Sequence, residues 1–212
     1  MKFNKVIQMA AKNKVLTIIN DVNGQWLNIG AACYFIGNTN FDVENIKPIL
    51  VSGDNWILHQ VNTEDIKSIS FADTYPLEEM AITSDITFNY IDKTISLFSR
   101  KDGSTILIDE KLLIPFIEKD ADIKFYIRNN AKFDYLAVKR GLILIGVVLP
   151  LDVGDGFKKD IENINRLVQL NHFERNKEEI LKVFKESLFD DLEEEENDDE
   201  ILNEQEGFED VL

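Results

Sequence analysis

Hydrophobic and polar residues follow each other along this chain with the periods of short helices and strands. The apolar positions of residues 3–13, "FNKVIQMAAKN", recur at helical spacing and predict a short helix; they are Phe3, Val6, Ile7 and Ala10. Two apolar runs, "KVLTIIND" and "QWLNIG", then flank Asn23-Gly24. This dipeptide favours a hairpin, because a type I′ turn needs positive φ at both central residues. Next, "FDVENIKPILV" predicts a short helix or turn interrupted near Pro48, and "NWILHQV" predicts a strand.

Clearer alternation follows a polar, irregular stretch at residues 62–84. In "DITFNYI" the alternate residues Ile86, Phe88 and Tyr90 are expected to point inward, with a turn at Asp92-Lys93 that leads back through "TISLF". Further strands are predicted at "TILI", "DIKFYIR", "FDYLAVK" and "LILIGVVL", with turns at Asp102-Gly103 and Arg140-Gly141, and a short helix at "EKLLIPFIEK". Because "LILIGVVL" is apolar on both faces, it predicts a central strand that is covered on both sides.

These elements predict an α+β protein. We expect a mainly antiparallel sheet built of hairpins, a few covering helices, a C-terminal helical segment and a disordered acidic tail. The expected α+β body spans residues 1–157, either as one unit or as two subdomains that divide near 62–84. The helical segment is expected at 158–186 and the tail at 187–212.

The negative charge of the chain is concentrated in that tail. The sequence has 39 acidic and 23 basic residues, a net charge of −16. Residues 187–212 hold 13 of the acidic residues and no Lys, Arg or His, which leaves 26 acidic against 23 basic residues elsewhere. Blocks of like charge are often interaction tails. We expect Phe208, Val211 and Leu212 to anchor on a protein partner while charge steers the tail toward it. Alternatively, residues 188–192 finish the helix and the rest is only solvated.

Two groups of basic residues are candidates for contacts with nucleic-acid phosphates. One lies on the predicted first helix, without any acidic neighbour, and comprises Lys2, Lys5 and Lys12. The other surrounds two successive predicted strands and comprises Lys124, Arg128, Lys132, Lys139 and Arg140. The alternative is that these side chains only solvate a surface. No RNP-type aromatic motif, zinc finger or helix-turn-helix pattern is present.

Residues that usually carry catalysis are scarce. The two histidines, His59 and His172, lie far apart, and the single Cys33 excludes an internal disulfide and a Cys-based metal site. The loop "DVGDGFKKD" at 152–160 offers glycines and lysines before a helix. It lacks the spacing of a phosphate-binding loop, so an ordinary turn is the better interpretation. We expect a protein that is not an enzyme and holds no metal or cofactor.

Targeting signals are also absent from the pattern. No run reaches 18 apolar residues, and the N-terminus lacks the uninterrupted apolar core of a signal peptide. We therefore expect a cytoplasmic protein without a membrane partner, in the host cytoplasm if a phage encodes it.

Two longer segments resemble known proteins. "QWLNIGAACYFIGN" (25–38) and "YLAVKRGLILIGVVLPLDV" (135–153) are similar to segments of an uncharacterised family in phages and mobile elements of low-GC Firmicutes. The second segment, a strand, a Gly-containing turn and an apolar strand ending in Leu-Pro, also resembles the end of a DNA sliding-clamp domain. A clamp is a ring of repeated antiparallel sheets with helices lining the hole. This resemblance therefore implies basic helices that face DNA, and helix 3–13 would be one of them.

The tail is similar to the acidic tails of bacterial and phage single-stranded-DNA-binding proteins, although this chain ends in Val-Leu and not in Phe. Those tails occupy the protein's own basic surface and recruit replication partners. Together, these features predict a phage-type accessory protein of DNA replication or DNA metabolism. Its body would bind nucleic acid or a replication protein, and its tail would recruit a partner or inhibit the protein itself. The alternatives are a protein-only interaction module, such as a virion component or a DNA-mimicking inhibitor, and an enzyme whose site no motif reveals.

Overall fold

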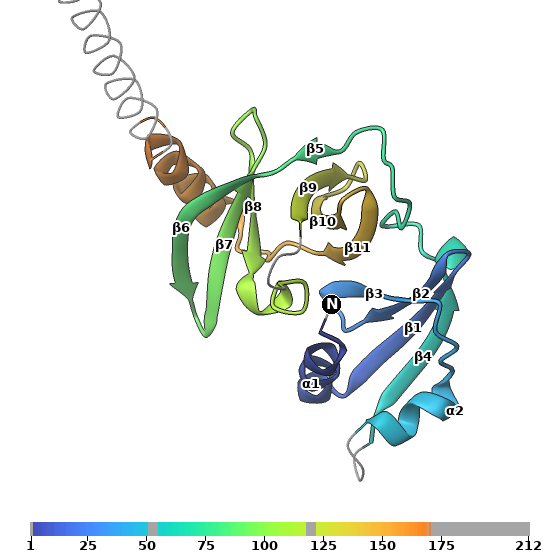
Figure 1. Ribbon diagram of the computed structural model, residues 1–212. Coiled ribbons are helices and arrows are strands. Elements are labelled where there is room, and N and C mark those ends of the chain that lie inside the picture. The colour runs from blue at the N-terminus through green and yellow to red at the C-terminus, as the bar shows by residue number, and fades with distance from the viewer. Residues whose placement is uncertain (1, 51–54, 118–121, 169, 171–212) are drawn as a thin grey trace, which may run out of the picture. The chain divides into compact units, whose positions relative to one another are not determined.

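The protein has an α+β fold, as the sequence predicts. The computed structural model describes residues 2–50, 55–117, 122–168 and 170, and Figure 1 shows their elements. The chain divides into two compact units, Met1–Glu162 and Asn163–Leu212. The first elements are α1 (Phe3–Asn13), β1 (Val15–Asp21), β2 (Gly24–Asn28), β3 (Ala32–Gly37), α2 (Val43–Ile46), the 3-10 turn η1 (Lys47–Ile49), β4 (Ile57–Asn62) and the 3-10 turn η2 (Thr63–Asp65).

The later elements are mostly strands. They are β5 (Glu79–Met80), β6 (Ile82–Tyr90), β7 (Lys93–Ser99), β8 (Thr105–Asp109), the 3-10 turn η3 (Glu110–Leu112), β9 (Ile123–Asn129), β10 (Asp134–Arg140) and β11 (Ile143–Val148), and residues 155–168 are helical. The short helix expected at "EKLLIPFIEK" is instead η3 followed by turns up to Phe116. Pro115 accounts for this difference, because it has no N–H to continue a helical hydrogen-bond pattern.

Two sheets organise the Met1–Glu162 unit. The larger has eight strands in the order β4-β1-β2-β3-β11-β10-β9-β5, and the smaller has the order β6-β7-β8. The described pairs are antiparallel except β1 with β4, which is parallel. Two meanders, β1-β2-β3 and β9-β10-β11, meet in the centre, where Ala32 pairs with Val148. A helical or turn segment precedes each meander: α1 the first, and residues 110–116 the second.

Two predicted hairpins are confirmed, but each turn lies one residue earlier than expected. Asp21 pairs with Gly24, so Val22 and Asn23 form the first turn, and neither has positive φ. Gly24 instead begins β2 with φ 143°, and a Cβ atom there would lie 2.6 Å from the carbonyl oxygen of Gly37. In the second hairpin Tyr90 pairs with Lys93, which puts the turn at residues 91–92.

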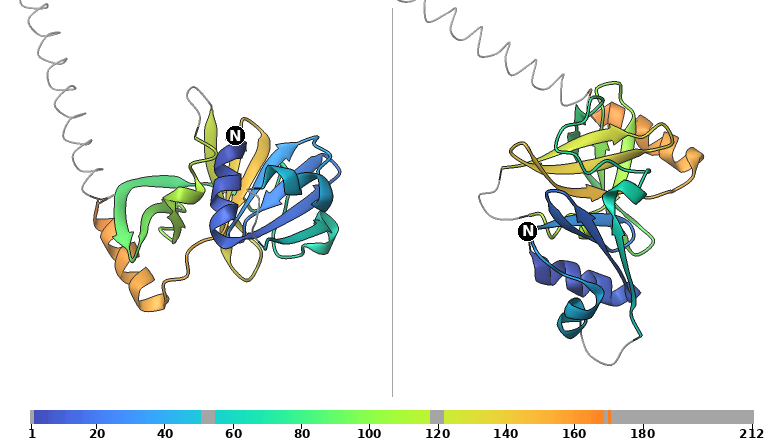
Figure 2. Two further views of the ribbon diagram at one scale, coloured as in Figure 1. Left: turned by 90° about the horizontal axis from the view of Figure 1, so that it is seen from below. Right: turned by 90° about the vertical axis from the view of Figure 1, so that its right-hand side faces the viewer.

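The main core lies between one face of the large sheet, the segments that precede its two meanders, and β7 and β8 of the small sheet. Val6, Ile7 and Ala10 of α1 are buried there together with Leu113 and Phe116. The backbone N–H of Lys2 donates to the carbonyl of Pro115 at 2.9 Å, so α1 and residues 110–116 are neighbours on this face. Figure 2 shows α1 lying along the strands of the first meander.

The opposite face of the large sheet is covered by residues 66–78, which we call the strap. Phe71 of the strap packs its ring edge on Trp26, with ring centroids 5.0 Å apart. β11 is buried between the two cores, with Val148 in the main core and Val147 beneath the strap, which confirms the predicted doubly covered strand. The inward residues predicted for β6 also pack as expected, around Ile95, Leu97 and Leu107 of the small sheet.

Candidate nucleic-acid interface

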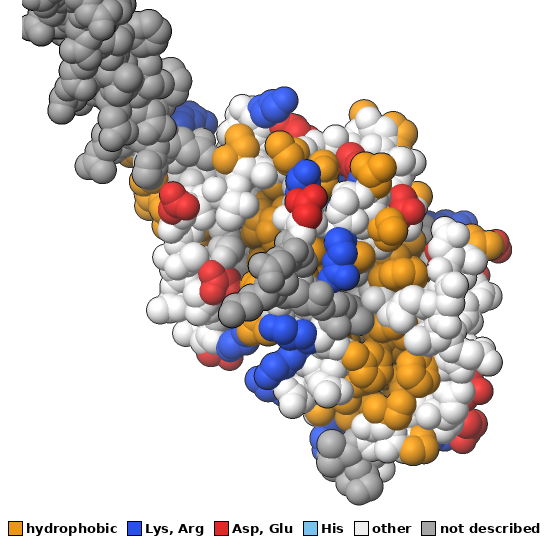
Figure 3. Space-filling model, viewed as in Figure 1, with side chains coloured by type: hydrophobic (Ala, Val, Ile, Leu, Met, Phe, Trp, Pro, Cys, Tyr) orange, Lys and Arg blue, Asp and Glu red, His pale blue; other side chains and the backbone are white. Residues whose placement is uncertain are grey.

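α1 presents a basic surface because its apolar stripe fixes how the helix is rotated. With Val6, Ile7 and Ala10 buried, Lys5 and Lys12 are exposed two turns apart on one side of the helix. Lys2 is exposed just before the helix. The first acidic residue of the chain is Asp21, after α1 has ended. No carboxylate of α1 therefore offsets these lysines, and Figure 3 shows Lys or Arg side chains beside this helix.

A hollow of about 400 Å³ extends this basic surface, and we call it the lysine cleft. Three lysines from separate segments line it: Lys12 of α1, Lys93 at the start of β7 and Lys111 of η3. Lys111 donates from Nζ to the carbonyl of Asp92 at 3.2 Å, which holds its ammonium group beside the β6–β7 turn. No sequence pattern groups Lys93 and Lys111 with Lys12, because only the tertiary fold brings the three segments together.

The rest of the lysine cleft combines an apolar lining with a few polar groups. The apolar side chains are Met9, Ile29, Leu112, Leu149, Pro150 and Leu151. Asn13, Asp92 and Asp109 are its polar members. One carboxylate oxygen of Asp109 accepts the backbone N–H of Lys111 at 3.0 Å. A cleft of this composition suits an anion that also carries an apolar body.

The second predicted basic group is not a surface cluster, since two of its five members are buried. The side chain of Arg128 is 0 % exposed and that of Lys139 is 6 % exposed, and both form ion pairs with Glu78 of the strap. Arg128 bonds Glu78 through Nη2 at 2.7 Å and also donates to the backbone carbonyls of Ser70, Ala72 and Asp73. These two cations hold the strap on the sheet and are not available to phosphates.

The strand register explains this correction. Arg128 and Lys139 lie on the same face of β9 and β10 as Tyr126, Tyr135 and Ala137, and the strap covers that face. Lys124, Lys132 and Arg140 are exposed, as predicted. Lys124 pairs with Asp122 at 3.6 Å, and Lys132 lies in the β9–β10 turn.

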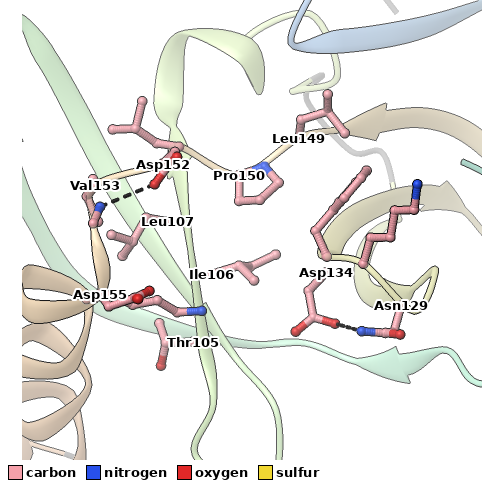
Figure 4. Close-up of a pocket in the computed structure, with 15 residues that line it drawn as sticks. Thr105, Ile106, Leu107, Asn129, Asp134, Leu149, Pro150, Asp152, Val153 and Asp155 are labelled. Carbon is pink, nitrogen blue, oxygen red and sulfur yellow. Dashed lines mark hydrogen bonds between the residues drawn. The ribbon is translucent and has the colours of Figure 1, made fainter. Parts of the chain in front are cut away.

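A larger hollow, of about 630 Å³, lies beside β8 and contains the start of the predicted loop 152–160 (Figure 4). Figure 4 shows Thr105, Ile106 and Leu107 of β8 on one side, Asn129 and Asp134 on the other, and Pro150 between them. The loop forms a turn with Gly154 at φ 76° and leads into the helix at 155–168, in agreement with its interpretation as an ordinary strand-to-helix turn.

Charges balance within this larger hollow. Asp134 is paired with Arg100 at 2.8 Å and accepts from Asn129 Nδ2 at 2.8 Å. Asp152 accepts the backbone N–H of Gly154 at 3.2 Å. The remaining charged lining groups are Asp155, Lys132 and Lys158. Because Asp134 is neutralised by Arg100, the two remaining aspartates face two lysines, and the hollow favours neither a cationic nor an anionic ligand.

The described residues offer little for acid–base or metal chemistry. Cys33 is buried, and burial raises the pKa of its thiol to about 12, so the reactive thiolate is suppressed at neutral pH. His59 is exposed on β4, whereas His172 lies outside the described residues. Among the described residues, no three His, Cys, Asp or Glu side chains are placed to share a metal ion. Nor does a helix in this part of the chain combine the length and apolarity needed to cross a membrane.

The predicted anchors of the tail, Phe208, Val211 and Leu212, lie outside the described residues, as do all of residues 171–212. Comparison of the chain with protein families, curated proteins and solved structures finds no match in any of the three.

Proposed function

We propose that this protein is a non-enzymatic accessory protein of DNA replication or DNA metabolism, of the phage type, and that it contacts nucleic-acid phosphates through one basic surface. That surface consists of Lys2, Lys5 and Lys12 with Lys93 and Lys111, and we call it the lysine surface. The observation that carries the proposal is the convergence of Lys12, Lys93 and Lys111 on one cleft beside a helix that has no carboxylate.

Electrostatics support this assignment despite the negative net charge of the chain. A surface that binds nucleic acid needs a local excess of cations, because each phosphate that a cation neutralises releases condensed counterions. Lys12, Lys93 and Lys111 line the cleft against Asp92 and Asp109, and Lys2 and Lys5 are exposed on or just before α1, which has no carboxylate. The lysine surface is therefore locally basic, while the tail accounts for most of the negative charge.

The test is the salt dependence of DNA binding. Fluorescence anisotropy with a labelled oligonucleotide, titrated over a range of salt concentrations, gives the slope of log affinity against log salt. The double variants Lys5→Gln/Lys12→Gln and Lys93→Gln/Lys111→Gln should each bind more weakly and reduce that slope by about 2, since each lost phosphate contact reduces it by about 1.

A charge-matched control separates a local contact from a change in net charge. Lys67→Gln/Lys101→Gln removes the same two charges from an exposed position in the strap and from the β7–β8 turn. It should leave the slope unchanged. Equal effects of all three double variants, or wild-type binding that salt does not weaken, would contradict the proposal.

A further inference from the structure

We infer that the lysine cleft takes an unpaired nucleotide, so that the protein prefers single-stranded nucleic acid to a duplex. This inference rests on the proposed function and names the ligand of the same surface. A nucleotide combines an anionic phosphate with a flat base of low polarity on its faces, and the cleft offers both kinds of partner.

Phosphate recognition comes from Lys12, Lys93 and Lys111. They lie on three segments, and the carbonyl of Asp92 already holds Lys111 in place at 3.2 Å. Of the two carboxylates in the lining, Asp109 is directed to the backbone N–H of Lys111. The lysines therefore outnumber the acidic residues of the cleft and favour an anion.

Base recognition comes from the apolar lining and Asn13. Met9, Leu112 and Pro150 supply surface that a base would cover, and Asn13 supplies an amide donor and acceptor for a base edge. The volume of about 400 Å³ falls within the range of small-ligand sites, roughly 300–1,000 Å³. A base in a duplex is stacked and paired, and moving it into such a cleft costs a few kcal/mol. An unpaired base has no pairing energy to lose, which gives the preference for single strands.

Ala31 allows the cleft to be blocked without a change in charge. It is exposed and lines the cleft, and its backbone carbonyl accepts the N–H of Leu149 at 2.8 Å, a bond that does not involve the side chain. Ala31→Leu should therefore fold normally while it fills the space for a base. Ala72→Leu, at an exposed position in the strap, is the matched control.

The experiment measures binding of a labelled 15-nucleotide oligo-dT and of a 15-base-pair duplex. Ala31→Leu should weaken oligo-dT binding about tenfold, the scale of one lost base contact, with duplex binding and the salt slope unchanged. Ala72→Leu should change neither. Ala31→Glu is a second variant that should weaken oligo-dT binding further.

The outcomes separate this inference from the proposed function. If both Ala31 variants bind oligo-dT like the wild type, or if the wild type binds duplex equally well, the inference is wrong. The proposed function stands in that case, provided that the lysine variants still reduce the salt slope. If the wild type binds neither DNA in a salt-dependent way, the proposed function and the inference both fail.

Discussion

Glu78 forms ion pairs with two buried cations, Arg128 and Lys139, and so compensates their charge. Alternation in "DIKFYIR" and "FDYLAVK" correctly predicts which residues share a face, but it cannot show whether a distant segment covers that face. The strap does so here, fifty or more residues away in sequence from its partners in β9 and β10. The sequence alone therefore does not show whether a basic side chain in a strand is exposed to solvent or buried beside a carboxylate, since both cases produce the same alternating pattern.

We expect Glu78→Gln to lower the free energy of unfolding by about 3 kcal/mol, because it leaves Arg128 and Lys139 buried without a carboxylate. Urea denaturation followed by circular dichroism measures the change. Glu44→Gln is the control, since the Glu44–Lys47 pair is exposed and should contribute less than 1 kcal/mol. Equal destabilisation by the two substitutions would show that the buried ion pairs do not hold the strap.

The lysine cleft also shows the limit of prediction at single residues. Lys12 could be identified because it lies on an amphipathic helix without acidic neighbours. Lys93 and Lys111 could not, since a turn lysine and a lysine in a 3-10 turn are common surface features. Their role in the cleft depends on the position of the small sheet relative to α1, and no local pattern encodes that position.

Elements were predictable where a pattern is local and strong. α1 and the strands of the hairpins follow directly from the spacing of apolar residues, because burial of one face imposes that spacing. The order of strands in the large sheet was not predictable. The parallel pairing of β1 with β4 and the antiparallel pairing of β3 with β11 join segments that lie far apart in the sequence. Periodicity describes the faces of a strand and contains no information about its neighbours.

Close packing of residues 110–116 on β11 gives a prediction for one glycine. A Cβ atom at Gly146 would overlap the ring of Phe116, which also stacks on Tyr34 with centroids 4.9 Å apart. Gly146→Ala should therefore destabilise the protein by about 2 kcal/mol through overpacking of the main core. Thermal or urea unfolding of the purified variant measures this cost.

Gly156 provides the contrasting position. It lies in the helix at 155–168, its φ is not positive, and a Cβ atom there would meet no neighbour within 4 Å. Gly156→Ala should leave stability unchanged or raise it by up to about 1 kcal/mol, since alanine favours helical backbone. A similar loss of stability in both variants would mean that the Phe116 contact is not the cause.

Over the whole molecule, charge is divided unequally between residues 1–186 and the tail. Removal of residues 187–212 changes the formal net charge from −16 to −3, because the tail holds 13 carboxylates and no cation. We expect this deletion to strengthen DNA binding at low salt, since long-range repulsion falls. The gain should shrink as salt rises and the Debye length falls from about 10 Å at 0.1 M to about 3 Å at 1 M.

A tail of equal length in which Gln and Asn replace Glu and Asp is the control for chain length, and it should behave like the deletion. The alternative of a DNA-mimicking inhibitor makes the opposite prediction. There the tail is itself the ligand, so its deletion or neutralisation would abolish binding to the partner, and the wild type would not bind DNA.

The central pairing of Ala32 with Val148 has a consequence for synthesis of the protein. The first meander leaves the ribosome long before β11 exists, so one edge of β3 has no strand to bond with while the residues between the two strands are synthesised. Unpaired strand edges promote misassociation between nascent chains. Completion of β11 supplies the missing partner of β3 and ends the exposure of that edge.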